Sequence, residues 1–275
     1  MTTGTEWQTA VGRNWAAVWP LTDRSFASLT QQLLDRLERL PGSTILDIGC
    51  GAGELSLAIA RHRPRAKVIG IDISPDLVAA ATERAGERAL VNFTVADAAQ
   101  WSQPSFAPDL LVSRHGVMFF DQPEAAFAHL AAIAAPGAAL AFSCFRDRKL
   151  NPWISQLAAL LPAEAATPFD PLAPGPFAFA DPARVEAVLL AGGWTDIAFE
   201  PLDFAYVAGL GPDPVADAAA FFQRIGPAAA ALRALAGSPA YEPFLARMAA
   251  WLEENRSGET VAFPAAAWFV TARRA

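Results

Sequence analysis

The sequence predicts an α/β protein built on a doubly wound, mainly parallel sheet of seven strands, with the last strand antiparallel. Short apolar runs typical of buried strands alternate with segments of helical periodicity over residues 44–145. The first run, residues 44–48, leads into a glycine-rich turn, and a helix is predicted from Glu54 onward. Sheets of this kind bind ligands beyond the carboxyl ends of their strands, so the candidate site is expected in the loops that follow those ends.

The turn after the first strand has glycine at positions 49, 51 and 53. Glycine lets a backbone turn sharply and lets a ligand approach bare amides. These amides precede a helix N-terminus, where unpaired N–H groups carry a partial positive charge. The turn therefore predicts a site for a carboxylate or phosphate, although a tight turn that binds nothing is the alternative.

Acidic residues follow the next strands. Asp72 ends the run 67–72 and lies 23 residues beyond Gly49 (72 − 49), close to the roughly 20-residue spacing of a ribose-binding acid. A helix cap is its other interpretation, but the segment 74–76 already supplies a capping signal. Asp97 follows the run 91–95, and the run 109–113 ends beside Arg114 and His115. Parallel strands would bring these loops together.

Together these motifs resemble those of the class I S-adenosylmethionine-dependent methyltransferases. ILDIGCGAGELS matches the family's glycine-rich motif, GIDIS its acidic ribose motif and VADAA its adenine segment. DLLVSRHGVMFF and APGAALAFSCF match its fourth and fifth strands, and the resemblance extends over roughly residues 7–273. It implies a Rossmann-like fold. The small-molecule branch related to quinone-biosynthesis methyltransferases is the most similar, through the segments 149–153 and 174–181.

The resemblance implies S-adenosylmethionine as the cofactor. Amides around Gly49 and Gly51 would line its methionine portion, and Asp72 would hold the ribose. Its other contacts would be Ile73 packing on the adenine, Asp97 accepting from the adenine amino group, the Ala98 amide at a ring nitrogen, and the Ser113 carbonyl facing the methionine amino group. The full predicted cofactor set is Trp15, Gly49, Cys50, Gly51, Asp72, Ile73, Asp97, Ala98 and Ser113. Glu54 argues against a dinucleotide site, where a third glycine is expected, and no lysine follows as in a P-loop.

Segments outside the core are predicted to cover the site. Trp7, Trp15 and Trp19 form either a hydrophobic plug or a lid with Trp15 and Asn14 facing the ligand, and both can hold. The last strand, near 260–272, is expected at the sheet edge as a hairpin partner. The predicted organisation is a helical lid over 1–41, a cofactor-binding core over 42–150, a crossover insertion over 151–180, continued core over 181–211, a helical cap insertion over 212–258 and a final core strand over 259–275.

Methyl transfer from a sulfonium needs positioning of the acceptor, exclusion of water and sometimes removal of a proton. His115 is the candidate base, since histidine titrates near neutral pH, and the alternative is a histidine packed under the cap. Arg114 is the second candidate catalytic residue. Arg114, Arg146, Arg148 and Lys149 could recognise an acceptor carboxylate, with solvated charge the alternative for the last two. No spacing indicates a metal site.

Composition limits the partners. The net charge is −7, which argues against nucleic acid, and no apolar run reaches the roughly 18 to 20 residues that span a bilayer. Two cysteines without metal-ligand spacing fit a reducing, cytoplasmic location. The expected function is methyl transfer to a small, partly apolar acceptor that could carry a carboxylate. The alternative is a non-methylating cyclisation or isomerisation on the same fold. The sequence leaves a homodimer open.

Overall fold

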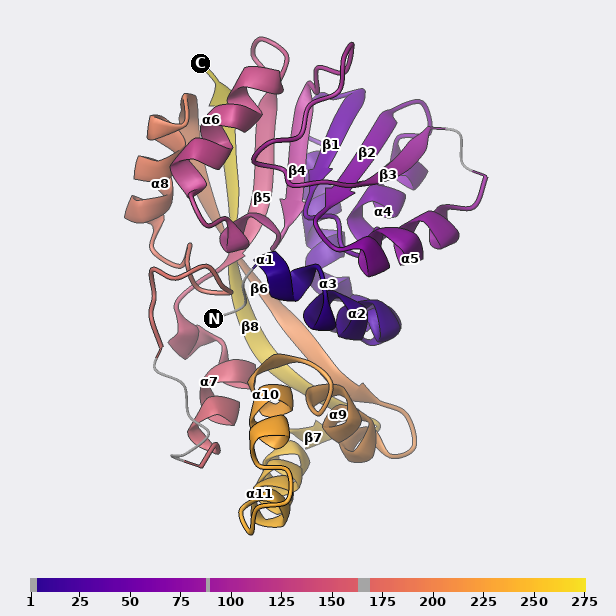
Figure 1. Ribbon diagram of the computed structural model, residues 1–275, viewed down its shortest axis with the longest axis vertical. Coiled ribbons are helices and arrows are strands. Elements are labelled where there is room, and N and C mark those ends of the chain that lie inside the picture. The colour runs from indigo at the N-terminus through magenta and orange to yellow at the C-terminus, as the bar shows by residue number, and fades with distance from the viewer. Residues whose placement is uncertain (1–3, 88–89, 163–168) are drawn as a thin grey trace.

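The computed structural model describes residues 4–87, 90–162 and 169–275, and its centre is a single twisted sheet (Figure 1). The strands run in the order β3-β2-β1-β4-β5-β8-β6. Their bounds are β1 (Thr44–Ile48), β2 (Lys67–Asp72), β3 (Val91–Val95), β4 (Leu110–Arg114), β5 (Ala139–Phe145), β6 (Trp194–Leu210) and β8 (Thr260–Arg274). β1 to β5 pair in parallel, whereas β8 is antiparallel to both neighbours. The predicted Rossmann-like fold with an antiparallel last strand is confirmed.

The expected place of the last strand was wrong. β8 lies between β5 and β6, so that β6 and not β8 forms the edge of the sheet. The register explains the difference, because Ala139 to Phe145 pair with one edge of β8 while most of β6 pairs with the other. β8 has an apolar sequence that is buried along most of its length, as suits an interior strand.

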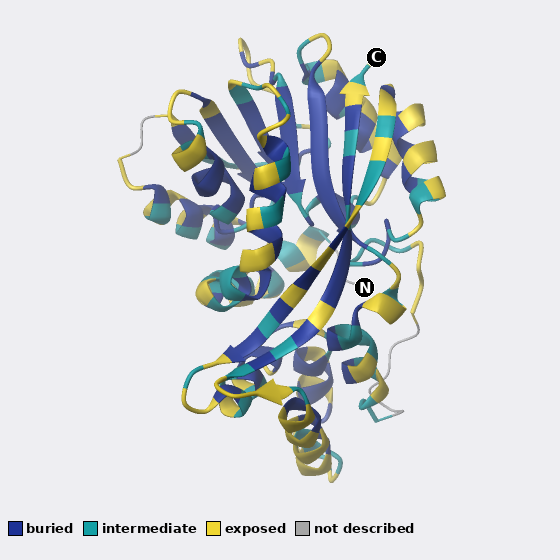
Figure 2. Ribbon diagram, turned by 180° about the vertical axis from the view of Figure 1, so that it is seen from behind, coloured by how far each residue is buried: buried dark blue, intermediate teal, exposed yellow. Residues whose placement is uncertain are grey.

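The central strands are covered on both faces. Consecutive residues of β4 and β5 are buried, which happens only when helices pack on each side of a sheet (Figure 2). The connecting helices are α4 (Glu54–His62), α5 (Pro75–Ala85), α6 (Pro123–Ile133) and α8 (Pro182–Ala191), and η1 (Val117–Phe119) is a short 3-10 turn after β4. This arrangement holds the carboxyl ends of β1, β2 and β4 at fixed positions.

β6 and β8 extend well beyond the other strands as a long two-stranded arm (Figure 1). Between them the chain forms α9 (Pro214–Phe222), α10 (Gly226–Ala234), α11 (Tyr241–Glu254) and the short β7 (Arg256–Ser257). The 3-10 turn η2 (Arg148–Leu150) and α7 (Pro152–Ala159) follow β5, and α7 packs on α10. Residues 163–168 of the predicted crossover, residues 88–89 and residues 1–3 of the predicted lid lie outside the described residues.

Three helices precede the sheet: α1 (Gly4–Trp7), α2 (Ala10–Ala17) and α3 (Trp19–Leu37). Pro20 lies in the first turn of α3, where its missing N–H costs nothing, and does not interrupt the helix. α2 packs closely on α5 at Gly12, where a Cβ would lie only 2.1 Å from Ser74 Oγ. Among the described residues, no helix is long and apolar enough to cross a membrane.

Candidate active site

The candidate site is a cavity of about 940 Å³ beyond the carboxyl ends of β1, β2 and β4. The N-terminal helices, the segment after β5 and the α9–α10 loop contribute to its walls. Most of the predicted site residues line it: Trp15, Gly49, Cys50, Gly51, Asp72, Ile73, Asp97, Ala98, Arg114 and His115. Ser113 does not. The cavity therefore gathers residues from the lid segment, four strand ends and the cap.

The glycine turn is tight, and two of its amides bond within the protein. Gly49, Gly51 and Gly53 all have positive φ, a conformation that favours glycine. The Gly51 amide donates to Asp72 Oδ2 at 2.9 Å, and the Cys50 amide donates to Ile71 at 3.0 Å. These two amides are therefore engaged within the protein, and Gly49, Cys50 and Gly51 all line the cavity; that the turn lines the methionine portion of the cofactor stays a prediction. The turn also fixes the Asp72 carboxylate.

Ser113 has a structural role in this arrangement. Its buried hydroxyl donates to the Ile48 carbonyl at 2.7 Å and accepts from the Gly116 amide at 3.1 Å. A Cβ on Gly49 would lie 2.9 Å from Gly116 Cα, so the loops after β1 and β4 touch through bare backbone. Ser113 thus ties together the two loops that frame the cavity and does not line the cavity itself.

The buried Asp72 carboxylate is held in place by backbone amides and lines the cavity. The Ser74 amide donates to Oδ1 at 2.9 Å, while Gly51 binds the other carboxylate oxygen. Burial raises the pKa of Asp72, and these backbone hydrogen bonds oppose the rise. Three backbone amides, those of Gly51, Ile73 and Ser74, bond this carboxylate, which still leaves acceptor capacity in a residue that lines the cavity. A fixed carboxylate of this kind matches a ribose hydroxyl.

The loop after β3 contributes two further predicted residues, Asp97 and Ala98, to the cavity. Asp97 accepts from the Ala99 amide at 2.9 Å and from Gln100 Nε2 at 3.1 Å. In the described part of the chain the Ala98 amide has no hydrogen-bond acceptor, although Ala98 is buried and lines the cavity. A buried amide without a partner is costly, so a ligand acceptor at Ala98 would satisfy it.

The N-terminal aromatic residues lie over this half of the cavity. Trp7, Asn14, Trp15 and Trp19 all line it. The Trp7 ring packs on Trp15, with centroids 5.5 Å apart, and on Phe119 at 5.2 Å. Trp7 Nε1 is buried without a hydrogen-bond partner. The tryptophans thus pack together and also border the cavity, so both interpretations of the cluster fit.

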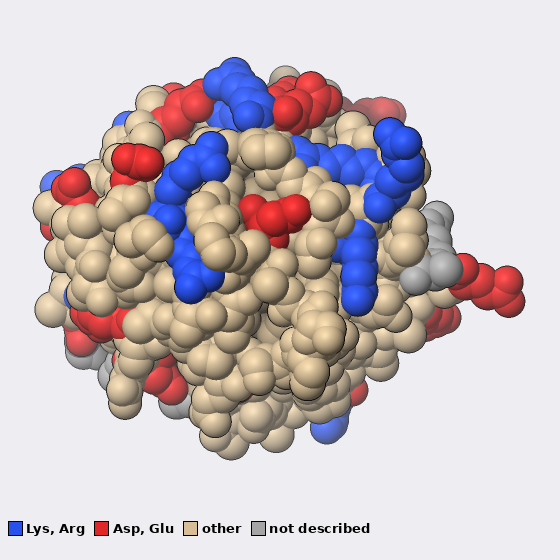
Figure 3. Space-filling model, turned by 90° about the horizontal axis from the view of Figure 1, so that it is seen from above, with Lys and Arg blue, Asp and Glu red and all other residues tan. Residues whose placement is uncertain are grey.

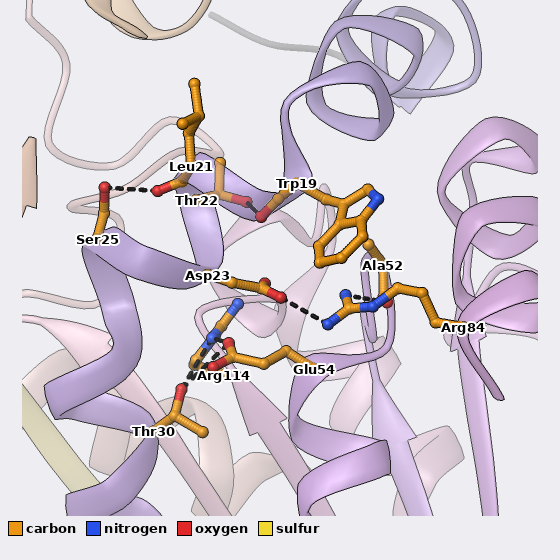
Figure 4. Close-up of polar contacts among 10 residues, drawn as sticks. All are labelled: Trp19, Leu21, Thr22, Asp23, Ser25, Thr30, Ala52, Glu54, Arg84 and Arg114. Carbon is orange, nitrogen blue, oxygen red and sulfur yellow. Dashed lines mark hydrogen bonds and ion pairs between the residues drawn. The ribbon is translucent and has the colours of Figure 1, made fainter. Parts of the chain in front are cut away.

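Arg114 belongs to a network of buried charges that fastens α3 to the core (Figure 4). It forms an ion pair with Glu54 and donates to Thr30 Oγ1 at 2.8 Å. Nearby, Arg84 donates to Asp23 at 2.6 Å and to the Ala52 carbonyl, and it stacks on the Trp19 ring. The guanidinium of Arg114 is therefore engaged by Glu54, which explains why the glycine turn is followed by an acid.

His115 occupies a strained and unusual position. Its φ is +62°, a left-handed conformation uncommon for residues other than glycine. The imidazole stacks on Phe145 with centroids 4.0 Å apart, and its Nδ1 lies 3.4 Å from Ser143 Oγ. Nε2 is buried without a partner in a residue that lines the cavity. Burial, aided by the charge of Arg114, lowers the pKa of His115 to about 3. This direction argues against a base that titrates near neutral pH.

The far end of the cavity is an aromatic wall that pattern analysis missed. Trp153 and Tyr206 stack with centroids 4.5 Å apart and an interplanar angle of 13°. Phe26 meets Tyr206 edge-on at 5.4 Å, and Phe145 lies 5.4 Å from Trp153. All four line the cavity. Because these rings come from α3, β5, α7 and β6, only the tertiary fold brings them together.

Asn151 positions one ring of this wall. Its side chain, fully buried, donates to the Ala266 carbonyl at 3.2 Å and accepts from the Ala266 amide at 3.0 Å. Its Oδ1 also accepts from Trp153 Nε1 at 3.3 Å. The Asn151 side chain therefore bonds the backbone of Ala266 as a neighbouring strand would. It also holds the Trp153 indole in place.

The cations expected at the mouth of the site are distributed unevenly. Arg146 pairs with Asp203 at 3.0 Å, and neither it nor Lys149 lines the cavity. Arg148 lines the cavity and stacks on Phe169 at 4.9 Å. Arg224, after α9, also lines it and had not been predicted. Among residues 4–87, 90–162 and 169–275, Arg148 and Arg224 form no ion pair.

Comparison with known proteins identifies the core of the chain. Residues 45–137 match the family described as "Methyltransferase domain". This segment is similar to methyltransferase domains. It contains the glycine turn, Asp72, Asp97 and His115.

Curated relatives align with a segment of similar length. The chain is 32% identical over 119 residues to a trans-aconitate 2-methyltransferase of Variovorax paradoxus (strain S110), covering 43% of this chain and 45% of the relative. It is 34% identical over 121 residues to aklanonic acid methyltransferase DauC of Streptomyces sp. (strain C5), covering 43% and 55%. The chain spans about half the length of the curated relatives it matches. The narrower resemblance to quinone-biosynthesis enzymes stays a prediction.

Solved structures extend the fold likeness to the whole chain. The [4+2]-cyclase SpnF is 20% identical with a TM-score of 0.56, covering 99% of this chain and 96% of that one. Haemonchus contortus phosphoethanolamine N-methyltransferase 2 in complex with S-adenosyl-L-methionine is 17% identical with a TM-score of 0.53, covering 99% and 57%. At these identities the likeness establishes the fold alone. The match to the methyltransferase family supports S-adenosylmethionine as the cofactor.

A further residue of the methyltransferase domain fits this cofactor. Asp47, only 1% exposed, accepts from Ser56 at 2.6 Å through Oδ2, whereas its Oδ1 is buried without a partner and the residue lines the cavity. Burial raises the pKa of Asp47 to about 6. An unpaired buried carboxylate oxygen is costly, and a ligand ammonium would satisfy it. The signal in the sequence was an acid in the middle of an apolar strand.

Proposed function

We propose that this protein transfers a methyl group from S-adenosylmethionine to a small, partly apolar acceptor that carries a carboxylate. The observation that carries the proposal is the set of unsatisfied or half-satisfied polar groups in one half of the cavity. The Asp47 oxygen, the Asp72 carboxylate and the Ala98 amide each have a free hydrogen-bonding position there. An amino acid linked to a nucleoside needs these three kinds of partner.

Each residue has a distinct task in this proposal. Asp47 pairs with the methionine ammonium, Asp72 accepts from the ribose hydroxyls, and Asp97 with Ala98 holds the adenine while Ile73 packs on it. Trp15 covers the cofactor and keeps water from it. When bound, the cofactor supplies a methyl group on a positively charged sulfur, so the protein needs mainly to orient the acceptor and exclude solvent.

The half of the cavity that the aromatic wall lines would hold the methyl acceptor, and it favours an acceptor with apolar surface. Its walls are the rings of Phe26, Phe145, Trp153 and Tyr206, which would bury a flat or branched carbon skeleton. Arg148 and Arg224 border the opening and offer forked donors to a carboxylate. Two of the relatives bear the names of acidic acceptors, trans-aconitate and aklanonic acid, which agrees with this class.

Transfer of label tests the proposal. The purified chain is incubated with S-adenosylmethionine labelled in its methyl group and a panel of small mono-, di- and tricarboxylic acids with apolar portions. Label should enter at least one acid, with S-adenosylhomocysteine formed in equal amount. Asp72→Ala should abolish transfer, and circular dichroism should show that the variant still folds. Failure to bind the cofactor would refute the proposal.

The cyclisation or isomerisation alternative has weaker support, because its basis is a neighbour that shares the fold alone. The lid over 1–41 and the cap over 212–258 are likewise part of the proposal, supported by the cavity-lining residues that both contribute. A cytoplasmic location is proposed on the two buried, unpaired cysteines. Acidic and basic side chains are interspersed on the face in Figure 3. A homodimer stays a prediction.

A further inference from the structure

Four ring side chains form a continuous row along the cavity, and all four line it: Phe169, Phe177, Phe145 and His115. Phe169, at the outer end, is 51% exposed, and its ring meets Phe177 edge-on with centroids 6.1 Å apart. Phe177 and Phe145 are buried with centroids 5.7 Å apart, and Phe145 stacks on His115 at 4.0 Å. The row therefore leads from solvent into the buried part of the cavity. A ligand that fills it would be long and mainly apolar.

The inner end of the row touches the glycine turn, in the half of the cavity proposed for the cofactor. Gly116 follows His115, and a Cβ on Gly49 would lie only 2.9 Å from Gly116 Cα. His115 Nε2 is buried without a hydrogen-bond partner in the part of the chain that the structure describes. A hydroxyl placed there can either donate to Nε2 or accept from it, so it satisfies this nitrogen in both tautomers of the ring. The end of an acceptor that receives the methyl group fits at this point.

The outer end of the row carries a cation. The Arg148 guanidinium carbon lies 4.9 Å from the centroid of the Phe169 ring, and the half-buried arginine lines the cavity. Because Arg148 forms no ion pair among the described residues, its forked donors can bind a carboxylate. Asp170, next to Phe169, also lines the cavity, and its Oδ1 accepts from the Leu172 amide at 2.9 Å. Its negative charge opposes a bound anion, so its removal is a useful test.

Two rings separate Arg148 from the inner end. A carboxylate on Arg148 would have Phe169 and Phe177 between it and the stack of Phe145 on His115. Arg114 lines the cavity at the inner end, but Glu54 already pairs with it. The carboxylate of an acceptor is therefore held better at the outer end of the row, away from the glycine turn.

We propose that the acceptor is an elongated acid that binds along this row, with its carboxylate at Arg148 and the group that receives the methyl at its opposite end, beside His115. This inference rests on the proposed methyl transfer and specifies the shape of its substrate and the end that reacts. The atom at the inner end shares its lone pair with the methyl carbon, the C–S bond breaks, and its electron pair stays on sulfur. A proton on that atom passes to solvent. The product is a methylated acid that keeps its free carboxylate.

Calorimetric titration of the wild-type chain loaded with S-adenosylhomocysteine tests the row. 4-(4-Hydroxyphenyl)benzoic acid is a long probe with a hydroxyl opposite its carboxylate. Its short counterpart is 4-hydroxybenzoic acid, and its uncharged counterpart is 4-(4-hydroxyphenyl)benzamide. The long acid should bind about tenfold or more tighter than either, because it buries a second ring and also makes a charged hydrogen bond. Equal affinities, or no binding of the long acid, would overturn the proposal.

Variants test where the carboxylate binds. Arg148→Gln should weaken binding of the long acid about tenfold or more and leave that of the amide unchanged. Arg224→Gln is the matched control, since Arg224 also lines the cavity without an ion pair among the described residues, and it should have a smaller effect. Asp170→Asn should strengthen binding of the long acid. A larger loss in Arg224→Gln than in Arg148→Gln, or an equal loss for acid and amide in Arg148→Gln, would contradict the role of Arg148.

The position of the new methyl group is the second test. The wild-type chain is incubated with S-adenosylmethionine and the long acid, and the product is identified by mass spectrometry. It should be 4-(4-methoxyphenyl)benzoic acid, the ether that keeps its carboxylate. Formation of the methyl ester, or a bound acid that gains no methyl group, would overturn the proposal. A chain that binds neither S-adenosylmethionine nor S-adenosylhomocysteine would instead refute the proposed function itself.

Discussion

Replacement of Asp47 by asparagine should make the protein more stable and its cofactor binding weaker. Burial without a partner for Oδ1 raises the pKa of Asp47 from 3.8 to about 6. One pKa unit corresponds to about 1.4 kcal/mol, so the ionised carboxylate destabilises the fold by about 3 kcal/mol near pH 8. Asparagine keeps a group that can bond Ser56 and removes the charge.

The sign of the pH dependence follows from the raised pKa. The folded chain holds the Asp47 proton more tightly than the unfolded chain does, so stability falls as pH rises above 3.8 and this loss is complete above about pH 6. Asp47→Asn has no carboxylate to ionise, so its stability does not fall in this way as pH rises. Its advantage in the free energy of unfolding should approach about 3 kcal/mol at pH 8 and shrink to about half of that at pH 5.

Urea denaturation followed by tryptophan fluorescence at pH 5 and pH 8, without cofactor, measures this advantage. Calorimetric titration should find that Asp47→Asn binds S-adenosylmethionine about 10- to 100-fold more weakly, the usual cost of losing a charged hydrogen bond. Ser56→Ala is the control, since it removes the 2.6 Å bond and keeps the charge, and it should lower stability at pH 8. A variant no more stable than wild type at pH 8, or unchanged in affinity, would refute the assignment of Asp47.

Three further changes test other parts of the site. Gly12→Val should weaken cofactor binding at least tenfold by calorimetry, because its Cβ would clash with Ser74 and displace α2. Unchanged affinity would show that the N-terminal helices do not contribute to cofactor binding. Arg114→Met should cost about 2 to 3 kcal/mol in urea denaturation because it removes the charged partner of the half-buried Glu54, and adding Glu54→Leu should recover much of this. Lost turnover at full stability would instead make Arg114 catalytic. Asn151→Leu should raise the KM for the acceptor more than it lowers kcat, and equal changes would count against a positioning role.

Local sequence signals predicted which loops converge on one cavity. The glycine turn and the acids after successive strands are close together in sequence or follow from parallel topology, so Asp72, Asp97 and Ala98 could be expected to converge. Asp47 was visible as an acid in an apolar strand, but its unpaired oxygen depends on the positions of atoms around it. The engagement of the Gly51 amide by Asp72 likewise depends on side-chain geometry.

Other features depend on long-range packing and could not be predicted from local pattern. β8 enters the sheet between β5 and β6, because its register with β5 buries it more fully than an edge position would. The aromatic wall joins Phe26 to Tyr206 across 180 positions of sequence (206 − 26). Arg114 looks like a free cation in sequence, and only the fold brings Glu54 and Thr30 to it.

The central claim is that the cavity binds S-adenosylmethionine, and calorimetric titration of the wild-type chain tests it most directly. S-adenosylmethionine and S-adenosylhomocysteine should each bind once per chain in the micromolar range, and NAD should not bind. Asp72→Ala should abolish both titrations while the chain keeps its fold. Binding of NAD, or of neither sulfur nucleoside, would contradict the account.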